Sequence, residues 1–73
     1  HRGMSRFKGV HFNKRKGLWA ARIQANSVGH SLGYHFREDD AALAYDEAAR
    51  RLFGEFARVN FPKTGEQPAR VEA

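Results

Sequence analysis

The fold of this chain is decided by residues 16–25, Lys-Gly-Leu-Trp-Ala-Ala-Arg-Ile-Gln-Ala. Successive side chains of a strand point to opposite faces, so the stretch divides into two sets. One face carries an apolar set that can pack in a core: Trp19, Ala21, Ile23 and Ala25. The other, which we name the open face, carries a small residue, a cation and an amide: Leu18, Ala20, Arg22 and Gln24. The sequence therefore predicts a central strand with one core face and one face suited to a polar partner.

Two more strands are predicted beside this one. The first covers residues 7–12 and is followed by a turn that begins at Asn13 and ends at Gly17. Asn and Gly favour turns because both tolerate positive φ. The second covers residues 28–34 after a two-residue turn at Asn26-Ser27, with Leu32 and Tyr34 expected on the core face.

The hydrophobic period changes after residue 37, where the sequence predicts a helix over residues 38–53. Acidic residues fill its first turn, Arg50 and Arg51 fill its last, and Gly54 follows as a stop signal. Helical spacing places a small, mostly apolar set on one side: Ala41, Ala44, Tyr45, Ala48 and Leu52. The same spacing turns another set toward water: Asp46, Glu47 and Arg50.

The chain of 73 residues has room for one domain. We expect a disordered edge at residues 1–4, an ordered domain at 5–62 and a disordered tail at 63–73, because the tail is polar and lacks aromatic residues. The chain has no cysteine, which rules out disulfides and thiolate zinc sites within it. No apolar run approaches the ~18 residues of a membrane span.

Charge is distributed very unevenly. Residues 1–37 hold eight of the thirteen Lys and Arg residues and no acid, a charge of +8. Residues 38–73 hold the other five basic residues and all eight acids, a charge of −3, which gives the net +5. Such an asymmetry favours a polyanionic partner for the first half, nucleic acid before anionic membrane, although an ordinary solvated surface is an alternative.

The sequence shows no catalytic set, metal site or cofactor site. Its candidate bases or ligands, His11, His30 and His35, lack the spacing of a metal motif. Neither a glycine-rich phosphate loop with its lysine nor a Ser-His-Asp set occurs. We therefore expect no enzyme activity, no cofactor and no small-molecule substrate.

A binding surface is better supported. Long cations can neutralise phosphates, while Arg, Gln, Asn and His side chains can reach base edges in the major groove. Trp19 is expected in the core, so the open face lacks a row of aromatic residues on which single-stranded bases would stack. The predicted nucleic-acid-binding residues are Arg6, Lys8, His11, Asn13, Lys14, Arg15, Lys16, Arg22, Gln24 and Ser31.

Five segments in this order resemble the AP2/ERF DNA-binding domain: Phe7–Val10, Lys16–Ile23, Ser31–Tyr34, Ala41–Ala49 and Gly54–Pro62. The resemblance covers about residues 5–62. It implies an α+β fold in which a three-stranded antiparallel sheet packs against one C-terminal helix, and it implies that the sheet enters the major groove of DNA.

The resemblance also implies contact positions. The family's base- and phosphate-contacting places fall on Lys8, His11, Asn13, the Arg15-Lys16 region, Arg22, Gln24, Gly29 and Ser31. Plant members prefer Arg at residues 11, 13, 24 and 29, Glu at 22 and Trp at 31. Because this chain departs from that pattern, it looks closer to the AP2 modules of bacterial and phage HNH homing endonucleases or integrases.

From these observations we expect a monomeric module that binds double-stranded DNA. It would be the targeting domain of a homing endonuclease or integrase-like protein, or part of a transcription regulator. We expect an intracellular location, in the cytoplasm or nucleoid of a bacterium or phage host, or in a eukaryotic nucleus. The alternatives are a module that grips A-form RNA by its shape and a small nuclease.

Overall fold

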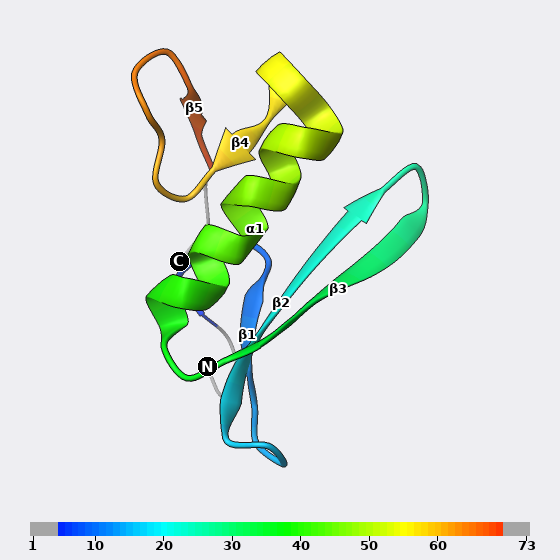
Figure 1. Cartoon of the computed structure of the whole chain (residues 1–73), viewed down its shortest axis with the longest axis vertical. Coiled ribbons are helices and arrows are strands. Elements are labelled where there is room, and N and C mark those ends of the chain that lie inside the picture. The colour runs from blue at the N-terminus through cyan, green and yellow to red at the C-terminus, as the bar shows by residue number, and fades with distance from the viewer. Residues whose placement is uncertain (1–4, 70–73) are drawn as a thin grey trace.

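The computed structural model describes residues 5–69 of the chain. Three strands, β1 (Val10–Asn13), β2 (Leu18–Ala25) and β3 (Val28–His35), form an antiparallel sheet in the order β1-β2-β3. They are followed by one long helix, α1 (Glu38–Phe53), which crosses one side of the sheet (Figure 1). This arrangement confirms the predicted fold class.

The bounds of α1 agree with those predicted, and both ends have a physical cause. Three acidic residues occupy the first turn, where they complement the helix dipole, and the Ser5 hydroxyl donates a hydrogen bond to the Glu38 carboxylate. At the other end Gly54 adopts φ 56°, a conformation that glycine enters without steric cost, and its N–H donates to the carbonyl of Arg50.

Small residues let α1 approach the sheet closely. One buried cluster joins sheet, helix and following segment: Ile23, Tyr45, Ala48, Ala49, Ala57 and Val59. A second joins the sheet to the start of the helix: Val10, Ala21, Ala41 and Ala42. Trp19 is half-buried and packs against this second cluster, on the core side as expected. The centre of its ring lies 5.1 Å from the centre of the Phe12 ring.

The first strand begins later than predicted, at Val10 instead of Phe7. Gly9 has φ 78°, which interrupts the extended backbone, although its carbonyl still accepts the N–H of Arg22 at 2.8 Å. A Cβ at Gly9 would lie 2.1 Å from the Tyr45 ring, so the chain passes directly against that ring. The prediction of a strand from residue 7 was therefore wrong, because the close approach needs a glycine conformation that ends the pleat.

Tyr34 lies on the open face, which contradicts its predicted place in the core. Ala20 pairs with Tyr34 but Arg22 pairs with Ser31, so Leu32 and Gly33 together face one residue of β2. This β-bulge shifts the alternation by one position, and Gly33 supplies the required φ of 91°. The His35 ring closes the bulge by donating from Nε2 to the carbonyl of Leu32, 3.1 Å away. Tyr34 is consequently 45% exposed.

Asp46 is fully buried, which contradicts the prediction that it faces water. The chain after α1 forms a short 3-10 helix, η1 (Gly54–Phe56), and then a two-residue strand, β4 (Arg58–Val59). The residues directly after β4 return to α1, where the backbone N–H groups of Asn60 and Phe61 donate to the Asp46 carboxylate. Helical spacing alone could not reveal these donors, because they come from residues outside the helix.

Residues 63–69 lie within the expected disordered tail and contain a short strand. Strand β5 (Gln67–Pro68) pairs in parallel with β4, beside α1 in Figure 1. The Arg50 Nε donates to the Glu66 carboxylate at 2.7 Å, and this hydrogen bond, aided by the Lys63 N–H, lowers the pKa of Glu66 to about 2. The expected disorder of residues 1–4 and 70–73 falls outside the described residues.

Candidate nucleic-acid interface

Three cross-strand pairs define the open face, which is the side of the sheet turned away from α1. His11 lies opposite Ala20, Arg22 opposite Ser31, and Gln24 opposite Gly29. Directly paired residues share a face, so the register brings together four of the predicted contact residues: His11, Arg22, Gln24 and Ser31. All four are exposed. Residues 10–35, which contain all three strands, include no acidic residue, so nothing within the sheet neutralises the cation at its centre.

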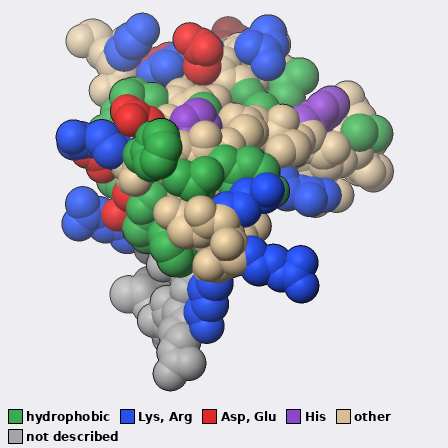
Figure 2. Space-filling model, turned by 60° about the horizontal axis from the view of Figure 1, so that its bottom comes forward, with side chains coloured by type: hydrophobic (Ala, Val, Ile, Leu, Met, Phe, Trp, Pro, Cys, Tyr) green, Lys and Arg blue, Asp and Glu red, His purple; other side chains and the backbone are tan. Residues whose placement is uncertain are grey.

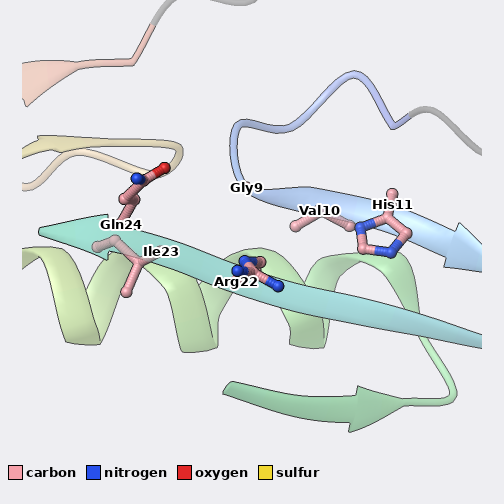
Figure 3. Close-up of a pocket in the computed structure, with 6 residues that line it drawn as sticks. All are labelled: Gly9, Val10, His11, Arg22, Ile23 and Gln24. Atoms are coloured by element: carbon pink, nitrogen blue, oxygen red, sulfur yellow. The ribbon is translucent and has the colours of Figure 1, made fainter. Parts of the chain in front are cut away.

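A shallow depression of about 300 Å³ lies where β1 meets β2. Figure 3 shows Arg22 between Gln24 and His11 along these two strands, with Gly9 just before β1. His11, Arg22 and Gln24 line the depression, so side chains that carry an imidazole, a guanidinium and an amide lie next to one another along these strands. This is the set of side-chain groups that can form hydrogen bonds with the edges of bases.

The β1–β2 turn carries three consecutive exposed cations, Lys14, Arg15 and Lys16. Asn13 shapes this turn, because its Oδ1 accepts the Lys16 N–H at 3.0 Å and its carbonyl accepts the Gly17 N–H at 2.8 Å. Figure 2 brings this end of the molecule forward and shows Lys and Arg side chains projecting from it. The turn therefore presents positive charge at one end of the open face.

Lys16 also connects the turn to the sheet. Its ammonium lies 4.9 Å from the centre of the Tyr34 ring, within the range of a cation–π contact. Sequence reasoning missed this contact because it placed Tyr34 in the core. The available signal was Gly33, since a glycine inside a strand pattern often marks a bulge.

The other two predicted contact residues, Arg6 and Lys8, lie outside the sheet. The Arg6 guanidinium is 5.2 Å from the centre of the Phe7 ring. Lys8 borders a different hollow of about 240 Å³, whose other lining residues come mainly from α1 and the segment after it: Tyr45, Phe53, Phe56 and Arg58. The structure therefore separates these two cations from the group on the open face.

Three further features of the described residues bear on the chemistry of the domain. Within residues 5–69, no three His, Asp or Glu side chains are grouped so that they could hold a metal ion. No helix among these residues is both long and apolar enough to cross a membrane. Behind the sheet, burial raises the pKa of the Tyr45 hydroxyl, and the adjacent Asp46 carboxylate raises it further. Tyr45 therefore stays neutral at physiological pH and acts as a packing residue.

Comparison with known proteins identifies relatives over most of the chain, although no family model matches it. Dehydration-responsive element-binding protein 2C of Arabidopsis thaliana is 40% identical over 63 residues, which cover 84% of this chain and 18% of the relative. Protein 2A of the same plant is 42% identical over 66% of this chain and 15% of the relative. Protein 2D is 39% identical over 86% of this chain and 34% of the relative.

The chain thus spans about a third or less of the length of these relatives. They are plant proteins, and their names give no support to an endonuclease or integrase parent. The identity of about 40% over most of the chain, together with a three-stranded antiparallel sheet followed by one helix, supports an AP2/ERF domain.

Proposed function

We propose that this chain is a double-stranded DNA-binding module that lays the open face of its sheet in the major groove. The observation that carries the proposal is the grouping of Arg22, Gln24 and His11 on one exposed, acid-free surface. Arg suits guanine and Gln suits adenine in that groove, so this surface has groups with which to read sequence.

The dimensions of the sheet fit this role. Strands β2 and β3 each contain eight residues, which correspond to about 26 Å of extended chain. Beyond the part of β2 that pairs with β1, the two strands continue as a two-stranded ribbon (Figure 1). A B-DNA major groove is about 12 Å wide and admits a ribbon of this kind.

The cations divide into two roles. Arg22 lies in the middle of β2 and is proposed to contact base edges. Lys14, Arg15 and Lys16 lie in the turn at one end of the face and are proposed to contact phosphates, which fixes position and supplies salt-dependent affinity. Arg6 and Lys8, which precede β1 and lie outside the sheet, would reach the phosphate backbone rather than the bases.

The parent protein is proposed to be a transcription regulator acting in a nucleus, because the relatives are named as element-binding proteins of plants. We propose that the domain binds as a monomer and needs neither a cofactor nor a small-molecule substrate. The endonuclease or integrase context finds no further support beyond the departures at residues such as Arg22 and Ser31.

The proposal is tested by selecting binders of the purified chain from randomised DNA duplexes at a fixed salt concentration. Enrichment of one short duplex sequence is the expected result. Equal recovery of all sequences would contradict base reading by the open face. The same chain is then titrated with matched DNA and RNA duplexes of the selected sequence, and tighter binding to RNA would favour recognition of A-form shape. Metal-dependent cleavage of the selected duplex would reveal a nuclease.

A further inference from the structure

The guanidinium of Arg22 lies over Gly29, a residue on the neighbouring strand. A Cβ placed at Gly29 would be 2.3 Å from Arg22 Nη2, 3.0 Å from Cζ and 3.2 Å from Nε. No carbon atom fits at such distances, so the guanidinium occupies the space that any other residue at position 29 would fill. Gly29 pairs with Gln24, one position along the open face from the Arg22–Ser31 pair, so the contact is diagonal across β2 and β3.

Glycine is not required here by the backbone. Gly9, Gly17 and Gly33 adopt left-handed φ values that favour glycine, whereas Gly29 does not. Within a regular strand, glycine is ordinarily less stable than alanine because it loses more conformational freedom. What distinguishes Gly29 is therefore the absence of its side chain beneath Arg22.

Other constraints on the guanidinium are few. Arg22 is exposed, and no carboxylate within residues 5–69 forms an ion pair with it. Its long side chain would otherwise sample many rotamers, and each one lost on binding costs affinity. Packing on the flat backbone at Gly29 limits the directions in which the guanidinium can point before DNA arrives.

We infer that Gly29 is a positioning residue that directs the Arg22 guanidinium and so determines which base pair the open face prefers. This inference rests on the proposed function, since it concerns how that face reads DNA. Gly29 has no side chain with which to contact a base itself. It acts by leaving room for Arg22 to lie along the sheet instead of projecting from it.

The test compares Gly29→Ala with the unaltered chain on the selected duplex and on duplexes changed at each base pair. The added methyl group displaces a flexible side chain rather than backbone, so the melting temperature should stay the same or rise slightly. Base preference at the position read by Arg22 should fall by about 5- to 150-fold, the range of one good bidentate contact. Val28→Ala, an exposed residue next to Gly29 on the same strand that pairs with Ala25 and so lies on the opposite side of the sheet, is the matched control.

A double-mutant cycle separates positioning from a general weakening of the sheet. In an Arg22→Ala background, Gly29→Ala should change neither affinity nor preference, because the group it displaces is already gone. An equal loss in both backgrounds would overturn the inference. In the free chain, nuclear Overhauser contacts between the Arg22 side chain and the Gly29 Hα protons should be present, and their absence would also overturn it.

The outcomes distinguish this inference from the proposed function. If the unaltered chain showed no preference among duplexes, the proposed function would fall and the inference with it. If the unaltered chain and Gly29→Ala showed the same preference, DNA recognition by the sheet would stand and only the role of Gly29 would fall.

Discussion

The buried carboxylate of Asp46 holds the backbone at Asn60. Its Oδ1 accepts the Asn60 N–H at 2.6 Å, and its Oδ2 accepts the N–H of the next residue, Phe61, at 2.8 Å. Asp46 is fully shielded from water, so these two donors provide the polar partners that a buried carboxylate requires. One helical side chain thereby fixes the path of the chain after the helix.

Asp46→Ala should therefore destabilise the domain more than other substitutions on α1. It leaves two backbone N–H groups without their partner, and a lost bond to a charged group costs about 1.5–3 kcal/mol each, so we expect a loss of about 3 kcal/mol or more. Urea unfolding followed by circular dichroism measures the change. Glu47→Ala, at the exposed neighbouring position, is the control and should lie within about 0.5 kcal/mol of the unaltered chain.

Acid should weaken the attachment of residues 63–69 through Glu66. The hydrogen bond from Arg50 lowers the pKa of Glu66 from its ordinary 4.5 to about 2 in the folded chain. The stabilisation is therefore fully present above about pH 5 and is lost as the pH falls toward 2. Glu66→Gln should remove this part of the pH dependence. The free energy of unfolding of the unaltered chain and of Glu66→Gln, measured between pH 7 and 2, tests this. If both changed with pH by the same amount, the contribution of the Arg50–Glu66 pair would be contradicted.

Arg22→Ala should cost about 1–3 kcal/mol of binding free energy on the preferred duplex and relax the choice of base at one position. The reason is that Arg22 is exposed in the centre of the open face. Arg51→Ala removes the same charge from α1, away from the sheet, and should leave base preference unchanged. Titrations on the preferred and altered duplexes measure both. If Arg22→Ala changed neither affinity nor preference, the assignment of the open face would be wrong.

Lys14→Ala should weaken binding to all duplex sequences alike and reduce the slope of log affinity against log salt concentration by about 1. Lys14 is exposed in the β1–β2 turn, where a phosphate contact would carry no sequence information. Lys63→Ala is the control, because Lys63 is an exposed lysine outside the sheet and its turn. A salt slope that is the same for Lys14→Ala and the unaltered chain would place the phosphate contact elsewhere.

Local sequence signals were sufficient for the elements with a clear period. The bounds of β2 and α1 agree with their predictions because alternation, first-turn acids and Gly54 all act within the element itself. The exposed positions of Arg22 and Gln24 follow from the same alternation. Alternation along β2 is therefore enough to place Arg22 and Gln24 on the open face.

The errors at Tyr34 and Asp46 both arise from contacts between elements, in the first case between adjacent strands and in the second between α1 and the segment that follows it. Tyr34 changed face because β3 carries a bulge opposite β2, and the Asp46 carboxylate accepts hydrogen bonds from the backbone of the segment after α1. Residues 63–69 are placed by the Arg50–Glu66 pair and by pairing with β4. Periodicity within one element contains no information about such partners.

The side chain of Asn60 makes two hydrogen bonds with the backbone of Lys8. Its Oδ1 accepts the Lys8 N–H at 2.8 Å, and its Nδ2 donates to the Lys8 carbonyl at 3.1 Å. Asn60 and Lys8 lie 52 residues apart in the chain, so these two hydrogen bonds are among the last contacts that a growing polypeptide can make. During synthesis, the β2–β3 hairpin and α1 leave the ribosome before Asn60 does. The hydrogen bonds of Lys8, just before β1, can form only after Asn60 has emerged. A nascent chain arrested at Phe53 would already contain every residue of the three-stranded sheet but would lack the two hydrogen bonds between Asn60 and Lys8.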